Sequence, residues 1–376
     1  MHFDLAPHTI LLTVGGSRAY GIHHDGSDVD VKGVAIPPGR TFHGFLESFD
    51  QCDDDGPIQA FLDRLTDEEK VICGQTKLEG VVYGLRKFAR LCADSNPNLL
   101  ETLFCRDDEI RVCTPLGERL RESRELFLSA RARHTFAGYA TSQLRRIKGH
   151  RRWLLHPPRA QPSRESYGLP QRTLIPADQL MAAEAGIVKK MDEWEVDYGS
   201  LERSSVIHIQ SQIAGFLAQI METTDARWRC ASRMIGYDEN FMALLDRERR
   251  YKSAMKEWQQ YQSWKKNRNA ARAELESRFG FDVKHGAHLI RLLRMGREIL
   301  IDGKVNVWRG DIDAEELIAI RQGQWSYERL IEEAEAENAG LEEIWQARSY
   351  VVPKAPDLEK LDALVVELVE SALRSV

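Results

Sequence analysis

The feature that most constrains this chain is a glycine-rich turn followed closely by two aspartates. An apolar run at residues 9–14 leads into Gly15-Gly16-Ser17, and Asp28 and Asp30 follow with one residue between them. Because alternate residues of a strand point to the same face, the two aspartates are expected to project together. The pattern predicts strands at 9–14 and 29–36, joined by a short helix over residues 17–24.

The chemistry of this stretch indicates a site for a metal-bound nucleoside triphosphate. Two adjacent carboxylates repel each other unless a cation lies between them, and hard oxygen ligands suit Mg²⁺ or Mn²⁺. Gly16 lets the backbone approach a phosphate, and amide groups beside Ser17 at the start of a helix would hold it. An isolated Asp-x-Asp is more typical of a solvated turn. The ordered combination of strand, turn, helix-length gap and paired acids favours the nucleotide site.

Length and composition set wide bounds. The 376 residues, with 43% hydrophobic and 29% charged side chains, are typical of a soluble protein of about two domains. No apolar run approaches the length of a membrane span, and the first residues have no secretory leader, so we expect a cytoplasmic protein without membrane contact. The cysteines contain no Cys-x-x-Cys pair, so neither a zinc site nor a disulfide framework is expected. They are Cys52, Cys73, Cys92, Cys105, Cys113 and Cys230.

A basic stripe interrupts an otherwise acidic chain. The net charge is −6, yet residues 126–164 contain no Asp or Glu and nine Lys or Arg. Such runs are often solvated faces, but this imbalance favours contact with phosphates or RNA. The residues expected to make it are Arg131, Arg133, Arg145, Arg146, Lys148, Arg151 and Arg152.

The elements predict an α+β protein. Residues 1–125 are expected to form a domain with a mixed sheet and flanking helices, and residues 126–376 a mainly helical region with a proline-rich loop near 156–176. Asn96-Pro97 is typical of a helix start. The other predicted elements are a strand at 77–82, helices at 83–92, 126–155, 178–192, 200–223, 238–278, 284–300 and 358–373, and a short strand at 304–308.

The motifs resemble those of the DNA polymerase β superfamily of nucleotidyltransferases. More closely, the chain resembles a branch of predicted nucleotidyltransferases associated with RNA-repair genes in phages and bacteria. The matching stretches are Gly-Ser-Arg-Ala-Tyr-Gly at 16–21, Ser-Asp-Val-Asp-Val-Lys-Gly-Val at 27–34, Leu-Arg-Lys-Phe at 85–88, Asn-Pro-Asn-Leu-Leu-Glu-Thr-Leu-Phe at 96–104 and Lys-His-Gly-Ala-His-Leu-Ile-Arg-Leu-Leu at 284–293.

The resemblance implies roles for individual residues. Gly16 and Ser17 would bind the triphosphate, and Asp28 and Asp30 would bind the metal ions. Glu79 holds the position of the family's third carboxylate, although the usual residue there is Asp. The acids at 53–55 are the alternative for the third carboxylate.

Basic residues near these motifs are candidate phosphate ligands. Arg18 and Lys32 are possible contacts or ordinary surface charges. Lys284, His288 and Arg291 share one face of a predicted helix, which would either bind phosphate or belong to an ordinary amphipathic helix. The histidines of this region have no carboxylate context of the kind found in zinc sites.

The expected function is therefore metal-dependent transfer of a nucleotide from an NTP to an RNA, such as a tRNA or a damaged RNA end, with release of pyrophosphate. Nucleotidylation of a protein hydroxyl, as in AMPylation, is one alternative. A non-catalytic module that binds RNA or nucleotide is another.

Overall fold

The computed structural model of the chain describes residues 3–24, 26–75, 78–173, 176–192, 233–268 and 270–374. The helix predicted at 200–223 lies outside the described residues. Contacts divide the chain into two compact units, one formed by Met1–Leu155 with Asn269–Val376 and the other by His156–Arg268. The helices after residue 269 therefore belong to the same unit as the N-terminal sheet. The sequence predicts a boundary after residue 125 and a single mainly helical region from 126 to 376.

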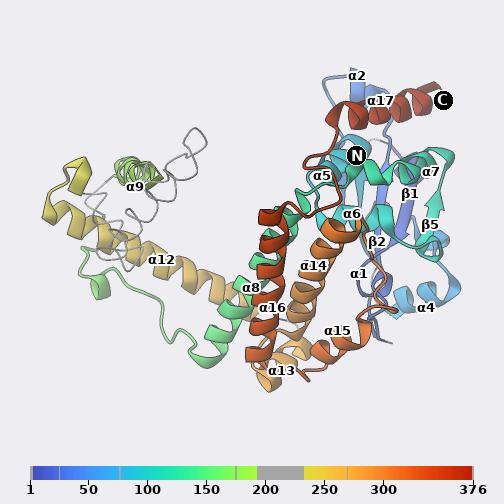
Figure 1. Ribbon diagram of the computed structural model, residues 1–376. Helices are drawn as coiled ribbons and strands as arrows, with labels where there is room; N and C mark the ends of the chain where they lie inside the picture. The colour runs from blue at the N-terminus through green and yellow to red at the C-terminus, as the bar shows by residue number, and fades with distance from the viewer. Residues whose placement is uncertain are drawn as a thin grey trace. The chain divides into compact units, whose positions relative to one another are not determined.

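The first unit contains a five-stranded mixed sheet, of which Figure 1 labels β1, β2 and β5. The strand order is β3-β4-β2-β1-β5. Strands β2 and β4 are parallel, and the other neighbours are antiparallel. The predicted mixed sheet is confirmed, with the first strand at its expected bounds. The strands are β1 Thr9–Val14, β2 Asp30–Ala35, β3 Gln51–Cys52, β4 Glu79–Gly84 and β5 Ile110–Cys113.

The two faces of the sheet pack into different cores. On β2, Val31 and Ala35 belong to a small core that also contains Ile58 of a short helix after β3 and Phe61 of the turn that follows it. Val34 belongs to the main core, formed with the long helices. Because side chains alternate along a strand, Asp30 and Lys32 lie on the same face as Val34. The candidate carboxylate at position 30 therefore faces the helical side of the sheet.

Short helices connect the strands and begin where the sequence supplies caps. Asn96 accepts a hydrogen bond from the amide of Asn98 at 3.1 Å, and Pro97 is the first residue of α6, as predicted. These elements are η1 Ala6–His8, α1 Gly16–Ala19, α2 Arg40–His43, α3 Asp55–Gln59, η2 Leu62–Arg64, α4 Asp67–Gln75, α5 Leu85–Ala93, α6 Pro97–Phe104, η3 Asp107–Glu109, α7 Pro115–Glu122 and η4 Arg124–Phe127.

Helix α14 is the centre of the helical layer, and it packs against α8, α15 and α16. Asp282 caps its first turn, and Gly303, with φ of +65°, ends it. Helix α17 packs against α5 and α7 beside the sheet. The helices of this layer are α8 Ala132–Leu155, α13 Ala270–Phe279, α14 Val283–Asp302, α15 Ala314–Arg321, α16 Tyr327–Ala347 and α17 Leu358–Arg374.

The strand predicted at 304–308 is wrong. Val305 and Val307 are buried in the main core, so the alternation that suggested a strand is real. This segment nevertheless pairs with no described strand of the sheet. It is an extended connection that leads to Arg309, whose amide donates to the carbonyl of Tyr20 at 3.1 Å.

The second unit contains η5 Glu165–Tyr167, α9 Ala177–Asp192 and α12 Glu239–Asn267. An ion pair between Arg164 and the buried Glu248 joins the loop after residue 156 to α12. The helix predicted over 238–278 is divided, because α12 ends at Asn267 and α13 starts at Ala270. None of the helices that the structure describes is long and apolar enough to cross a bilayer.

Candidate active site

A cavity of about 970 Å³ collects residues from both ends of the chain. The glycine turn and the two aspartates form one side, and helices α8, α14 and α15 contribute the other. Seven of the candidate nucleotide and metal ligands singled out from the sequence line it, namely Gly16, Ser17, Asp28, Asp30, Lys284, His288 and Arg291. Two further cations, Arg146 of α8 and Arg321 of α15, line it as well.

The glycine turn is held against the start of β2. The amide of Gly15 donates to the carbonyl oxygen of Asp30 at 2.8 Å. Gly16 has φ of +64°, and a Cβ added there would collide with Oδ2 of Asp30. Both the left-handed backbone and the close approach of the carboxylate therefore require glycine at position 16.

The two aspartates differ in exposure. Asp28 is exposed just before β2, and Asp30 is half-buried at its first residue. Burial raises the pKa of the Asp30 carboxyl, Lys284 and Lys32 lower it, and Asp28 raises it further, with a net upward shift. The positive charges of Lys284 and Lys32 therefore do not fully offset the cost of keeping the Asp30 carboxylate charged. A divalent cation between the two carboxylates would supply the missing positive charge.

Helix α14 presents a basic face to the cavity. The carboxylate of Asp282 accepts a hydrogen bond from the amide of His285 at 3.1 Å, which fixes the first turn of the helix. Lys284, His288 and Arg291 all line the cavity, as their helical spacing predicts. The positive charge of Lys284 acts on Asp30 across the cavity.

His288 is a neutral hydrogen-bond donor. Its Nδ1 lies 3.0 Å from Nη2 of Arg291, and a guanidinium group only donates, so Nδ1 must accept and Nε2 must carry the proton. Burial and the charge of Arg291 lower the pKa of His288 to about 3. The imidazole therefore offers an N–H group without a charge over the physiological pH range.

Tyr20 and Arg291, which line the cavity, belong to a buried ionic network. Arg291 Nη1 lies 2.5 Å from Glu101 Oε1, and the Tyr20 hydroxyl donates to Glu101 Oε2 at 2.6 Å. The Arg291 guanidinium also lies 3.6 Å from the centre of the Tyr20 ring. Lys32 Nζ lies 3.8 Å from Glu101 and donates to the carbonyl of Asn98 at 3.1 Å. The network joins β2, α1, α6 and α14.

Glu101 was missed by the sequence analysis. Burial opposes its charge, but Arg291, Lys32 and the hydrogen bond from Tyr20 outweigh that effect and hold the pKa of Glu101 below its usual value. The available signal was an acidic residue within the apolar run 99–103, on a helix whose neighbouring leucines are buried. A charged group in such a position is usually paired.

Residues 4–156 match a family model described as the RNA repair pathway DNA polymerase beta family. This part of the chain is similar to that family. Comparisons with curated proteins and with solved structures found no match.

The matched region, residues 4–156, supplies one wall of the cavity and part of the other. It contains the glycine turn, both aspartates and the whole of α8, because the match ends one residue after Leu155. Lys284, His288 and Arg321 lie beyond the matched residues. The cavity is therefore completed by helices that follow the second unit in the sequence.

Arg18 and Glu79 lie outside the cavity lining. Arg18 donates to the carbonyl of Ser27 at 3.2 Å and lies 3.9 Å from Glu68, so it supports the loop that leads to Asp28. Glu79 is exposed, although the register of β2 and β4 pairs it with Asp30 and places both on one face. The oxygens of Asp28, Asp30 and Glu79 do not all lie within 4.8 Å of one another.

The acids at 53–55, the alternative third carboxylate, do not line the cavity. Asp54 precedes α3 and Asp55 is its first residue, and both are exposed. Their position supports the interpretation of a solvated turn at the start of a short helix.

The basic stripe on α8 is divided between internal pairs and exposed residues. Arg131 pairs with Asp94, Arg133 pairs with Glu342, and Arg151 donates to the carbonyl of Gly280. These contacts link α8, and the exposed Arg131 just before it, to neighbouring segments. The remaining residues of the predicted stripe are exposed, namely Arg145, Arg146, Lys148 and Arg152.

Proposed function

We propose that this protein transfers a nucleotidyl group from an NTP to an RNA acceptor and releases pyrophosphate. The observation that carries the proposal is a single cavity in which paired carboxylates and a glycine turn face cations from three helices. A nucleoside triphosphate with its metal ions needs both kinds of group. The match of residues 4–156 to the RNA repair pathway DNA polymerase beta family supports the same reaction.

The residues fit a divalent metal, because the carboxylates of Asp28 and Asp30 are hard oxygen donors and Asp30 lacks full charge compensation. Mg²⁺ or Mn²⁺ bound there would stabilise the attacking and leaving oxygens of an in-line displacement. Glu79 faces the same side of the sheet as Asp30, and it remains the proposed third carboxylate.

The chain's own groups then have separate tasks. Gly16 and Ser17 bind the triphosphate, and Lys284, Arg146 and Arg321 neutralise its charge. The acceptor hydroxyl oxygen bonds to the α-phosphorus, the bond to the β-phosphate oxygen breaks, and pyrophosphate leaves. Asp30, the less exposed carboxylate, accepts the hydroxyl proton. His288 donates its neutral N–H to an oxygen of the bound nucleotide.

The test is incubation of the protein with Mg²⁺ and each α-labelled NTP, with total RNA in one reaction and lysate protein in another. We expect label on RNA. Label on protein instead would favour the nucleotidylation of a protein hydroxyl. Absence of label on both, with RNA bound equally well by the parent and by Asp28→Asn, would favour a non-catalytic binding module.

The exposed part of the α8 stripe makes a second prediction. We expect the double variant Arg145→Gln/Lys148→Gln to bind RNA more weakly and with less salt dependence, because each lost phosphate contact lowers the slope of log K against log salt by about 0.7. Filter binding over a range of salt concentrations measures both quantities. The matched control, Lys304→Gln/Lys354→Gln, removes two exposed lysines away from α8. An equal loss of affinity in both variants would contradict the assignment.

Gly16→Ala tests the turn. A methyl group at this position collides with the Asp30 carboxylate and strains a left-handed backbone, so we expect at least about a 100-fold loss of nucleotide transfer. Gly56→Ala is the control, because a Cβ at Gly56 meets open space. Initial rates at saturating NTP measure the effect. Activity within threefold of the parent would mean that the turn does not position the nucleotide.

A further inference from the structure

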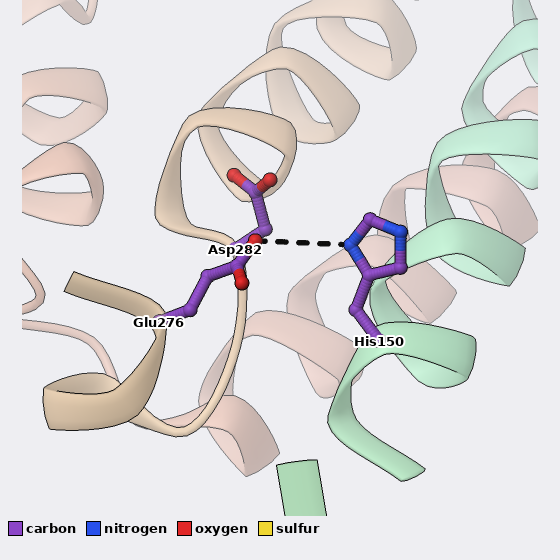
Figure 2. Close-up of side chains that lie close together, drawn as sticks. All are labelled: His150, Glu276 and Asp282. Carbon is purple, nitrogen blue, oxygen red and sulfur yellow. Dashed lines mark ion pairs between the residues drawn. The ribbon is translucent and has the colours of Figure 1, made fainter. Parts of the chain in front are cut away.

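A second group of metal-ligating side chains lies at the helical wall of the cavity, which Glu276 and Asp282 line. His150 of α8, Glu276 of α13 and Asp282 at the start of α14 each offer one ligand atom, and these atoms all lie within 4.8 Å of one another. Figure 2 shows His150 facing Glu276 across a short gap, with Asp282 beside them. We propose that His150, Glu276 and Asp282 bind one divalent transition-metal ion, with Zn²⁺ as the best fit.

The chemistry of the donors favours a transition metal over Mg²⁺. An imidazole nitrogen with two carboxylates suits Zn²⁺, whereas Mg²⁺ prefers an all-oxygen shell with several waters. His150 Nδ1 lies 3.8 Å from Glu276 Oε1. Ligands of tetrahedral zinc lie about 3.3 Å apart, given bonds of about 2.0–2.1 Å, so a small contraction brings these donors into range.

Burial gives the cation an electrostatic role. Glu276 and Asp282 are each 1% exposed, and two carboxylates so close together destabilise each other in a low-dielectric surrounding. An ion bound by both carboxylates and by His150 would link α8, α13 and the start of α14.

His285 contacts one of the proposed ligands from outside the set of three, as neighbours of metal ligands commonly do. Its Nδ1 lies 3.0 Å from Asp282 Oδ2, and its ring centre lies 6.2 Å from that of His150. A histidine that orients a ligating carboxylate fixes the geometry of the site. The ring of His150 in turn stacks on Trp153, with centres 5.7 Å apart. Two of the three ligands, Asp282 and His150, are thus oriented by neighbours outside the set.

The ion would act on the cavity through two of its cations. Arg146 precedes His150 by one helical turn on α8, and Lys284 follows Asp282 by two residues on α14. A metal ion bound by His150, Glu276 and Asp282 would therefore hold in place the parts of α8 and α14 that carry these two cations. This consequence rests on the proposed function, whereas the metal binding itself does not.

The test is a calorimetric titration of chelator-treated, dialysed full-length protein with ZnCl₂, with Mg²⁺ in large excess. We expect one tight equivalent of Zn²⁺ and a higher Tm when it is bound. Glu276→Gln and His150→Gln should weaken binding at least about 100-fold, because each removes a ligand and leaves the side-chain volume nearly unchanged. His43→Gln, at an exposed histidine of α2, is the matched control and should bind as the parent does.

The outcomes separate this site from the nucleotide site. The double variant Asp28→Asn/Asp30→Asn should still bind the Zn²⁺ equivalent, and loss of that equivalent there would place the ion with the catalytic acids and overturn the proposal. Equal Zn²⁺ affinity in the parent and a folded Glu276→Gln protein, judged by circular dichroism, would also overturn it. RNA labelling that persists without any tight Zn²⁺ site would refute this inference and leave the proposed function standing.

Discussion

Replacing Asp30 with asparagine should lower nucleotide transfer by about 1000-fold or more while the protein stays folded. The substitution keeps the size of the side chain and removes the charge that binds the metal ion and receives the acceptor proton. Because burial raises the pKa of the Asp30 carboxyl, its charged form is destabilising where it stands. We therefore expect the free energy of unfolding to be unchanged or higher. Steady-state rates of α-labelled NTP transfer, together with urea unfolding, measure the two effects.

The matched control is Asp63→Asn, an exposed aspartate outside the cavity lining. It should transfer nucleotide as the parent does. The same experiment on Glu79→Gln decides the third carboxylate. A loss as large as that of Asp30→Asn would assign Glu79 to the metal ions, and a loss below tenfold would exclude it. An Asp30→Asn protein with more than a tenth of the parent rate would refute the proposed mechanism itself.

The local half of this site was predictable because local rules determine it. The turn at Gly15-Gly16 and the alternation around Asp30 follow from backbone geometry over a few residues. The start of α6 at Pro97 and the shared face of Lys284, His288 and Arg291 follow in the same way. In each case, the residues that determine the feature are near neighbours in the chain.

The other half depends on contacts between distant segments. Arg146 and Arg321 line the cavity only because α8 and α15 pack against α14, which the sequence does not specify. The group of His150, Glu276 and Asp282 could not be predicted for the same reason, since His150 and Glu276 lie 126 positions apart in the sequence. The prediction of a strand at 304–308 was wrong for the opposite reason. Its local pattern of alternate burial is present, but no neighbouring strand is available to pair with it.

The buried network behind the cavity is where the tertiary packing should be most sensitive to substitution. We expect Arg291→Met to lower the free energy of unfolding by about 3–5 kcal/mol, because it leaves the buried Glu101 carboxylate short of its closest partner. Arg291 is 1% exposed and Glu101 is 4% exposed, so water cannot replace the lost contact. Lys32 remains 3.8 Å away and compensates only in part. Urea unfolding followed by circular dichroism gives the difference.

A double-variant cycle separates the ion pair from the loss of packing. Glu101→Gln combined with Arg291→Met should be less destabilising than Arg291→Met alone, since no buried charge is then left without its partner. Arg374→Met, which breaks the exposed pair with Glu370, is the control and should not shift the unfolding midpoint measurably. If Arg291→Met changed the stability by less than about 1 kcal/mol, the network would not hold the sheet and α14 together. Arg291→Met should also disturb the candidate active site, because the same guanidinium that pairs with Glu101 also fixes the tautomer of His288.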